Sequence, residues 1–363
     1  MPTLLVMAGG TGGHIFPGLA VAKKLQKAGW HIHWLGTADR MEADIVPAHG
    51  FDISFITISG LRNKNLITWL KLPFKLINSL LQALSVIRKT KPDVVLGMGG
   101  YASAPGGLAA WLMNKPLVVH EQNAAAGLTN RLLARIATQV CCAFPNAFNA
   151  NIIAQVVGNP LRANIGDREN QNALKKSRNI LVVGGSLGAQ ILNKIVPESF
   201  AKLVENSDEN NDLPFNIWHQ TGKGKQQGVI ERYNKHSLTD GKVRVTEFID
   251  DIGSAYQWAD IVICRAGALT VSELAMAAKP AIFIPLPHAV DDHQTKNALY
   301  LVSRGAGILI KQNDLTDEIL TKQLNTLFSE PQILTQMAKS AFAAADADAT
   351  NKVANICQQL AIA

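Results

Sequence analysis

Residues 4–14 read LLVMAGGTGGH, an apolar strand that runs directly into a glycine-rich turn. The same arrangement returns about half a chain later, where residues 180–189 read ILVVGGSLGA. A strand that breaks into glycines and then starts a helix exposes backbone N–H groups, and such groups bind phosphate. Two such turns predict two similar α/β domains that face one diphosphate-bearing ligand. A tight turn without a ligand is the alternative for each.

Short apolar runs alternate with helical patterns along the whole chain, which is typical of βαβ units and parallel sheets. We expect strands near residues 3–8, 31–35, 93–97, 116–120, 139–142, 179–183, 215–220, 243–246, 260–263, 281–284 and 307–309. We expect helices over residues 17–28, 40–48, 72–90, 104–113, 127–137, 188–204, 224–233, 251–257, 270–278, 293–304, 315–328 and, with a break, 331–361. The predicted fold class is therefore α/β, with parallel sheets in two similar domains.

The regular alternation stops between Phe144 and Asn179, where prolines and a polar run predict a domain boundary near residues 158–166. We therefore expect an N-terminal domain over residues 1–160 and a C-terminal domain over residues 161–340. The last segment, residues 341–363, is predicted to be a helix that could pack back on the first domain.

Composition excludes several classes of protein. No stretch approaches the ~20 apolar residues of a membrane span, and the N-terminus lacks the basic region of a secretory signal. The four cysteines form neither a disulfide framework nor a CxxC metal pattern, which fits a reducing cytoplasm. Residues 1–165 hold 15 Lys and Arg against 6 Asp and Glu, whereas residues 166–363 hold 20 against 22. The first half should therefore meet an anionic partner.

The first glycine turn does not match a dinucleotide-binding fingerprint. Ile15 stands where the third glycine should be, and the next strand ends in Leu35-Gly36-Thr37 without an acid for a ribose diol. A nicotinamide-dependent oxidoreductase is therefore excluded. Four glycines together with Thr11 and His14 exceed what a turn requires, so we expect a functional loop with His14 at the helix start.

Several polar residues follow predicted strands, at the edge where open α/β sheets bind ligands. A third glycine-dense loop, residues 97–107, follows one strand, and residues 120–123, HEQN, follow the next. Within HEQN we expect Glu121 to be structural and Asn123 functional. In the second half, Thr270-x-x-Glu273 matches a helix capping box. Glu273 could equally accept hydrogen bonds from a ribose diol, and both alternatives stay open.

Two further segments suggest ligands. His288, Asp291, Asp292 and His293 lack the usual spacing of metal ligands, so we expect no metal and instead a loop that bonds sugar hydroxyls. Residues 61–91 are amphipathic and basic, which predicts either a membrane-surface segment or an ordinary surface helix. The aromatic and basic interleaving of a nucleic-acid interface is missing, so no nucleic-acid partner is expected.

Seven blocks, in order and from end to end, resemble the bacterial UDP-N-acetylglucosamine–undecaprenyl-diphospho-muramoylpentapeptide N-acetylglucosaminyltransferases. The blocks are GGTGGHIFPGLAVA (9–22), GMGGYASAPGGLAA (97–110), HEQNAAAGLTN (120–130), GNPLR (158–162), GGSLGAQILN (184–193), CRAGALTVSELA (264–275) and DDHQTKNA (291–298). The resemblance implies the GT-B arrangement, an α/β fold of two Rossmann-like domains whose parallel sheets face each other across a cleft. It also implies that the C-terminal domain binds the donor UDP-N-acetylglucosamine, while the N-terminal domain binds the lipid acceptor.

The resemblance implies roles at the matching positions. In the N-terminal half, Thr11, Gly12 and Gly13 belong to the loop facing the donor, Asn123 contacts the sugar, and Arg162 holds the diphosphate. In the C-terminal half, the implied donor contacts are Ser186 on the diphosphate, Phe248 and Ile249 around the uracil, Ala268, Leu269, Thr270, Val271, Ser272 and Glu273 along the donor with Glu273 on the ribose, and His293 and Gln294 on the sugar hydroxyls.

The implied reaction is an inverting transfer from UDP-N-acetylglucosamine to the 4-hydroxyl of the muramoyl sugar of lipid I, which gives lipid II. His14 is the expected general base, or else a hydrogen-bonding partner of the acceptor diphosphate. No metal or cofactor is expected. The implied location is peripheral, at the cytoplasmic face of the inner membrane, beside other cell-wall synthesis and division proteins. Another UDP-sugar enzyme of this fold, such as a 2-epimerase or a lipid glycosyltransferase, is the alternative, followed by a non-catalytic scaffold.

Overall fold

The computed structural model describes residues 1–58, 72–162, 165–166, 178–185, 187–207, 214–238, 241–287 and 289–362. The chain forms two compact units. Unit 1 comprises Met1–Ala163 and Asp346–Ala363, and unit 2 comprises Asn164–Ala345. The C-terminal segment therefore belongs to the same unit as the N-terminus.

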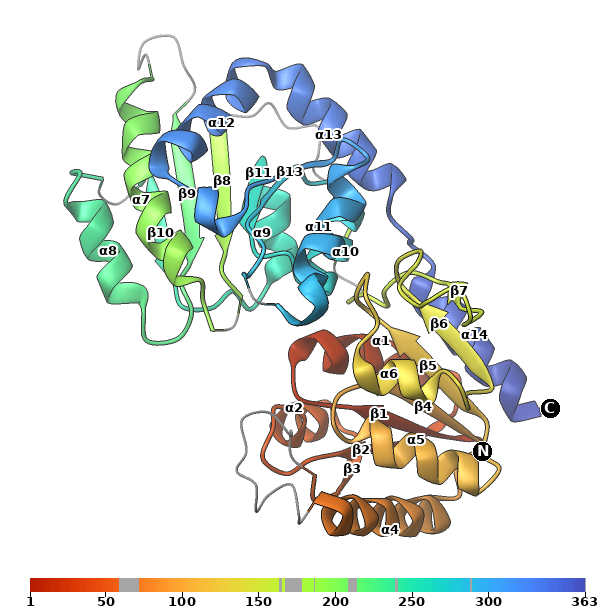
Figure 1. Ribbon diagram of the computed structural model, residues 1–363. Helices are drawn as coiled ribbons and strands as arrows, with labels where there is room; N and C mark the ends of the chain where they lie inside the picture. Colours follow the sequence, from red (N-terminus) through yellow and green to blue (C-terminus); the bar gives the residue numbers. More distant parts are fainter. Residues whose placement is uncertain are drawn as a thin grey trace. The chain divides into compact units, whose positions relative to one another are not determined.

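Unit 1 contains a fully parallel sheet with the strand order β3-β2-β1-β4-β5-β6-β7 (Figure 1). Its strands are β1 (Thr3–Ala8), β2 (His31–Gly36), β3 (Asp52–Phe55), β4 (Val94–Gly99), β5 (Leu117–Glu121), β6 (Gln139–Cys142) and β7 (Gln155–Val156). The order reverses between β1 and β4, and open α/β sheets bind ligands in the crevice beyond such a reversal. The strands β3 and β7 were not predicted from the sequence.

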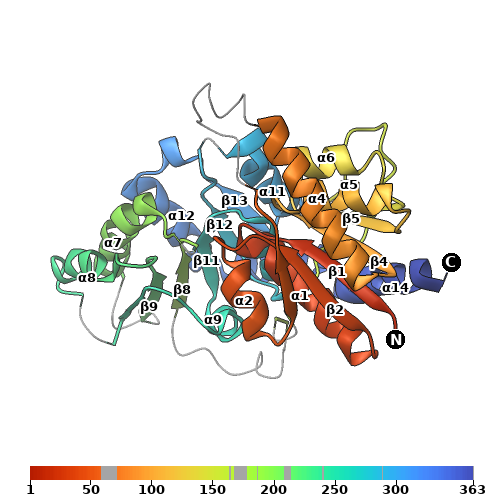
Figure 2. The same cartoon turned by 90° about the horizontal axis from the view of Figure 1, so that it is seen from below.

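Helices cover both faces of this sheet. They are α1 (Gly12–Lys27), α2 (Glu42–Ala48), α4 (Leu72–Thr90), α5 (Ser103–Leu112), α6 (Leu128–Leu133) and α14 (Ala349–Ile362). Ile15, Leu19 and Leu25 give α1 a buried face at helical spacing. The C-terminal helix α14 packs beside α1 (Figures 1 and 2), and its Val353 and Cys357 are fully buried in the same core.

Unit 2 repeats this design with a parallel sheet in the order β10-β9-β8-β11-β12-β13. Its strands are β8 (Arg178–Val183), β9 (Phe215–Gln220), β10 (Val243–Thr246), β11 (Ile261–Cys264), β12 (Ala281–Phe283) and β13 (Gly307–Leu309). Its helices are α7 (Gln190–Glu205), α8 (Gln226–Asn234), α9 (Ile252–Trp258), α10 (Ala268–Met276), α11 (His293–Val302), α12 (Asp317–Ser329) and α13 (Pro331–Ala343), with short 3-10 turns η1 (Val290–Asp292) and η2 (Gln312–Asp314). The strand order reverses here between β8 and β11, and the second glycine turn directly follows β8.

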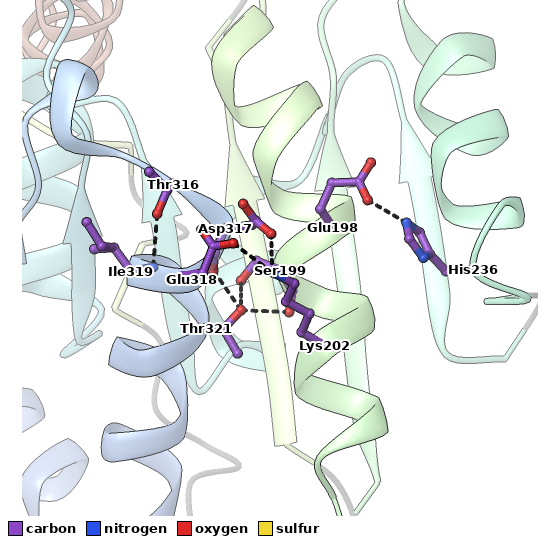
Figure 3. Close-up of polar contacts among 9 residues, drawn as sticks. All are labelled: Glu198, Ser199, Lys202, His236, Thr316, Asp317, Glu318, Ile319 and Thr321. Atoms are coloured by element: carbon purple, nitrogen blue, oxygen red, sulfur yellow. Dashed lines mark hydrogen bonds and ion pairs between the residues drawn. The ribbon is translucent and has the colours of Figure 1, made fainter.

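Helix α7 is fixed against α12 by polar contacts as well as by the core (Figure 3). The buried hydroxyls of Ser199 and Thr321 lie 3.0 Å apart, and Thr321 also donates to the Ser199 carbonyl. At the surface, Lys202 donates to Glu318 at 2.9 Å. These contacts fix the second half of α7, the helix that follows the second glycine turn, against α12.

The expected break in the last helical segment lies at residues 344–348, between α13 and α14. There Asp346 accepts a hydrogen bond from the Asp348 N–H, which turns the chain locally. No helix in the described part of the chain is long and apolar enough to span a membrane.

Candidate active site

The first glycine loop leads from β1 directly into α1. The helix begins at Gly12, five residues earlier than the sequence suggested, so Gly12, Gly13 and His14 form its first turn. Thr11 is the N-cap residue, with an extended backbone (φ −139°, ψ 156°). The His14 N–H already donates to the Thr11 carbonyl at 3.1 Å. The preceding N–H groups, those of Gly12 and Gly13, have no carbonyl of the helix within reach. This turn can therefore donate to a ligand at the sheet edge.

A buried carboxylate, which the sequence analysis missed, holds this loop from beneath. Glu42, at the start of α2, is 1% exposed and accepts hydrogen bonds from the Gly10 N–H (2.9 Å) and the Thr37 N–H (3.1 Å). It also accepts the Thr37 hydroxyl at 2.7 Å. A side chain at Gly9 or Gly36 would collide with Glu42. Gly9 and Gly36 are therefore needed to make room for the Glu42 side chain, whether or not the loop binds a ligand.

His14 is held in one orientation by the loops after β1 and β4. Its Nδ1 lies 3.1 Å from the Gly9 carbonyl oxygen, which can only accept, so in the neutral ring Nδ1 carries the proton. Its Nε2 then keeps a lone pair. A Cβ at Gly99 would lie 3.0 Å from the ring, and one at Gly100 would collide with Gly9. Both glycines have positive φ, +102° and +91°. His14 thus has the tautomer that a general base requires.

The end of β5 carries the predicted HEQN segment, and Glu121 is its structural centre. Its buried carboxylate accepts the Asn123 N–H (2.9 Å), the Asn123 side-chain amide (3.1 Å) and the Asn130 amide (2.9 Å). It also accepts the Gly127 N–H. The prediction that Glu121 is structural is confirmed, and its bonds fix the orientation of Asn123.

His120 and Gln122 connect β5 to the segment that leaves unit 1. His120 Nε2 donates to the Gly158 carbonyl at 2.9 Å, and its Nδ1 accepts from the Gln122 amide at 3.1 Å. The Asn159 amide donates to the Gln122 carbonyl. Burial lowers the pKa of His120 to about 4. A neutral, fully bonded imidazole of this kind supports the backbone rather than exchanging protons with a substrate.

Arg162 lies beside the first glycine loop. Its guanidinium stacks 3.8 Å from the centre of the Phe16 ring, and its Nε is buried without a hydrogen-bond partner among the described residues. A Cβ at Gly12 would lie 2.9 Å from the same ring. The chain Gly12–Phe16–Arg162 therefore brings the arginine to the start of α1. Ser186, its expected partner on the diphosphate, lies outside the described residues.

The second glycine loop is held by a neutral amide. The Gln220 side chain accepts the Gly185 N–H at 3.1 Å and donates to the Gly185 carbonyl at 3.0 Å. It also donates to the Glu247 carbonyl at 2.8 Å. Gly188 has a φ of +69° and packs on the Thr221 carbonyl, where no Cβ fits. Gln220 was not predicted, although a polar residue that ends the buried strand β9 was a visible sign.

The expected uracil contacts follow β10, and the expected ribose contact lies on α10, which follows β11. After β10, Phe248 is 57% exposed while Ile249 is buried. Helix α10 begins at Ala268 with Gly267 as its N-cap, so Thr270 lies inside the first turn and the capping-box interpretation is wrong. Glu273 instead accepts the Tyr256 hydroxyl at 3.1 Å.

The remaining expected contacts lie on helices α10 and α11. The predicted donor residues of α10 fall into a buried set and a partly exposed set: Ala268, Val271 and Glu273 are buried, and Leu269, Thr270 and Ser272 are partly exposed. His293 and Gln294 begin α11, and Gln294 accepts the Leu286 N–H at 2.9 Å. The buried Asn297 amide donates to the Ala266 carbonyl, which links α11 to the start of α10.

Arg265, which follows β11, was missed. Its guanidinium donates to the Ile284 and Pro285 carbonyls and, at 2.7 Å, to Gln312. Burial lowers its pKa. It anchors the end of β12 beside the expected sugar contacts. In the described part of the chain, no cluster of three His, Cys, Asp or Glu residues could hold a metal ion, and His288 lies outside that part.

Two doubly wound parallel sheets, each with a glycine loop at its reversal point, define the GT-B class of glycosyltransferases. The chain matches the glycosyltransferase family 28 N-terminal domain over residues 4–142 and the family 28 C-terminal domain over residues 179–359. It belongs to glycosyltransferase family 28.

Named relatives align with nearly the whole chain. The UDP-N-acetylglucosamine--N-acetylmuramyl-(pentapeptide) pyrophosphoryl-undecaprenol N-acetylglucosamine transferase of Colwellia psychrerythraea is 67% identical, over 99% of this chain and 93% of the relative. The crystal structure of Acinetobacter baumannii MurG is 40% identical with a TM-score of 0.81, covering 99% of this chain and 100% of that chain. A putative UDP-N-acetylglucosamine 2-epimerase from Listeria monocytogenes, at 15% identity and a TM-score of 0.68 over 97% of this chain and 94% of that chain, shares the fold.

Proposed function

We propose that this chain transfers N-acetylglucosamine from UDP-N-acetylglucosamine to the muramoyl sugar of undecaprenyl-diphospho-muramoylpentapeptide, lipid I, and thereby makes lipid II for peptidoglycan. The observation that carries this proposal is the 67% identity to a relative with that name over 99% of the chain. The competing 2-epimerase function is supported only by a shared fold at 15% identity.

The donor is proposed to bind unit 2. The N–H groups at the start of α7 and the Ser186 hydroxyl suit an anionic diphosphate, because a helix N-terminus carries a partial positive charge. Phe248 offers an exposed ring for the uracil, and the Glu273 carboxylate suits the ribose diol. His293 and Gln294 supply groups for the sugar hydroxyls.

In the proposed reaction, the acceptor 4-hydroxyl oxygen attacks C1 of the donor sugar and loses its proton to Nε2 of His14. The bond from C1 to the diphosphate oxygen breaks, UDP leaves with the electron pair, and the α-linkage becomes β. Charge then grows on the diphosphate, and Arg162 with the backbone N–H groups stabilises it. One well-placed hydrogen-bond donor of this kind typically lowers the activation barrier by about 2.7–4 kcal/mol.

The direct test incubates the protein with labelled UDP-N-acetylglucosamine and lipid I and measures lipid II. Release of free N-acetylmannosamine or UDP without lipid II would favour the 2-epimerase instead. The role of His14 is tested with His14→Ala, which should lower kcat across the pH range. His49→Ala is the matched control, because His49 is exposed in the same unit and bonds only a local helix carbonyl among its described contacts. A His14→Ala enzyme with wild-type kcat at every pH would remove the histidine from the mechanism.

Unit 1 is further proposed to attach to the cytoplasmic face of the inner membrane. Helices α4 and α5 pack together and expose large apolar side chains: Phe74 is 76% exposed, Leu81 58% and Trp111 50%. Lys75 and Arg88 lie on the same helix α4. Such a face suits acyl chains and lipid phosphates. Residues 61–71 of the amphipathic basic segment predicted over residues 61–91 lie outside the described residues.

Vesicle binding tests this attachment. Phe74→Ser combined with Leu81→Ser should weaken sedimentation with phosphatidylglycerol vesicles while turnover of a water-soluble acceptor survives. Ile153→Ser is the control, because Ile153 is 95% exposed in the same unit but precedes the edge strand β7. Equal vesicle binding by the double variant and the control would contradict the proposal.

A further inference from the structure

Unit 2 carries a groove of about 550 Å³ between α7 and α8, which the proposed reaction does not use. Its walls come from the first two turns of α7, the loop before α8 and one face of α8. The lining residues are Gln190, Asn193, Lys194, Gly224, Lys225, Gly228, Val229, Glu231, Arg232 and Lys235. Its volume lies in the range of sites for small molecules, about 300–1,000 Å³.

The charge of the groove selects an anion. Three lysines and one arginine line it against a single carboxylate, Glu231. The half of the chain from residue 166 onward has 20 basic against 22 acidic residues, so the groove gathers cations in a part of the chain that is not basic. Val229 is its single aliphatic lining residue. A polar, cationic lining suits a soluble phosphorylated molecule better than an acyl chain.

Gly228 is a second sign of a ligand. It lies within α8, where glycine weakens a helix relative to alanine. Its φ is not positive, and an added Cβ would meet nothing within 4 Å, so neither backbone conformation nor packing explains it. An open, exposed glycine in the lining of a cationic groove allows a ligand to approach the helix backbone closely.

The walls of the groove are held in place. Glu198 on α7 and His236 after α8 are joined at 2.6 Å (Figure 3), which pins the two helices together at one end. The buried Asn193 amide donates to the Thr221 carbonyl, and its oxygen contacts His219 at 3.1 Å. Burial lowers the pKa of His219 to about 3, so this support stays neutral. A pre-formed site loses little entropy when it binds.

One lining residue connects the groove to the second glycine loop. Lys225 donates to the Leu187 carbonyl at 2.7 Å, and Leu187 lies between Gly185 and Gly188 in that loop. We propose that the groove binds a soluble, multiply phosphorylated metabolite and that the bound anion draws Lys225 away from Leu187, which loosens the loop. Binding itself is independent of the proposed function, whereas an effect on the donor rests on the proposed role of this loop.

The probe is inorganic pyrophosphate, measured by equilibrium dialysis with saturating UDP present so that the proposed donor site is filled. Wild-type protein should bind it. Arg232→Gln combined with Lys235→Gln should bind at least about tenfold more weakly, because charge-assisted bonds are lost. Lys322→Gln combined with Lys339→Gln is the matched control, with the same charge change on exposed residues of α12 and α13. Gly228→Gln should fill the groove, weaken binding and leave the melting temperature unreduced.

Coupling to the loop is read from hydrogen exchange. The Gly188 N–H donates to the Gly185 carbonyl at 2.8 Å, and pyrophosphate should speed its exchange in the wild type but not in the groove variant. Equal pyrophosphate affinity in the groove variant and the lysine control would overturn the site. If the groove variant lost binding to phosphatidylglycerol vesicles while its pyrophosphate binding stayed unchanged, the site would likewise be overturned in favour of a lipid surface. Unchanged Gly188 exchange would overturn the coupling, and lipid II synthesis without pyrophosphate tests the proposed function separately.

Discussion

Glu42→Gln is expected to loosen the first glycine loop while the rest of unit 1 stays folded. The carboxylate uses Oε1 for Thr37 and Oε2 for the Gly10 N–H. Glutamine keeps the size and one acceptor oxygen, which can continue to serve Thr37. Its amide nitrogen then faces the Gly10 N–H, donor against donor, and that bond is lost.

The magnitude follows from the character of the lost bond. A hydrogen bond to a charged group contributes about 1.5–3 kcal/mol. Each ~1.4 kcal/mol is a factor of ten in an equilibrium constant, so the open form of the loop should become about 10–150-fold more populated. Amide hydrogen exchange of Gly10, followed by mass spectrometry or NMR, measures this population.

Asp44→Asn is the matched control. Asp44 lies in the same first turn of α2 and is exposed, so the substitution makes the same charge change without touching the loop. It should alter Gly10 exchange by less than about threefold, since surface substitutions usually change stability by less than about 0.5 kcal/mol. Equal exchange rates in the two variants would refute the reasoning that Glu42 holds the loop.

Phe16→Leu removes the ring beneath Arg162, and a cation–π contact contributes about 0.5–2 kcal/mol. KM for the donor should therefore rise severalfold in Phe16→Leu and stay near the wild-type value in Phe16→Tyr, which keeps an aromatic ring. A KM unchanged by the leucine substitution would contradict this. His120, with its pKa lowered from 6.5 to about 4, stays neutral in the fold while the unfolded chain takes up a proton. The contribution of His120 to the free energy of unfolding, up to about 3 kcal/mol, is therefore present above pH 6.5 and lost as the pH falls toward 4. A His120 imidazole NMR signal that titrates near pH 6.5 in the folded protein would disprove this. Thr321→Val removes a buried bond between α7 and α12 and should cost about 1–3 kcal/mol in urea unfolding, more than Lys202→Met at about 0–1 kcal/mol; the reverse order would be inconsistent with the structure.

The sequence predicted most of the framework because its central strands are continuous apolar runs buried on both faces. β1 and β8 end in glycine turns at the expected residues. The two missed strands have no such run. β3 reads DISF with every residue at least partly exposed, and β7 is two exposed residues long. Edge strands of this kind gain their structure from a neighbouring strand rather than from their own pattern.

The candidate site divides in the same way. Loops at strand ends were predictable, because glycines and polar residues that follow apolar runs can be recognised in the sequence. Glu42 and Gln220 were not, because each acts on a loop about 32 to 35 residues away in the chain. Local pattern also misled at Glu273: the Thr270 capping box matches in spacing, yet Glu273 is bonded by Tyr256, 17 residues earlier.

The two glycine loops share one backbone feature, and the groups beneath them differ in charge. Gly10 and Gly185 have φ values of +89° and +83°, and the N–H of each donates to a side-chain oxygen. That oxygen belongs to Glu42, which lies beyond β2, in the first loop and to Gln220, which ends β9, in the second. In unit 1 that oxygen belongs to a carboxylate, and in unit 2 to a neutral amide. A unit charge about 6 Å from a phosphate costs about 3 kcal/mol at an effective dielectric constant of ~20. We therefore expect the first loop to disfavour a diphosphate and to suit neutral sugar hydroxyls beside His14, and the second loop to accept an anion. The glycine pattern alone predicts a repeated phosphate motif, and the buried partners Glu42 and Gln220 support the proposed division into an acceptor-side loop and a donor loop.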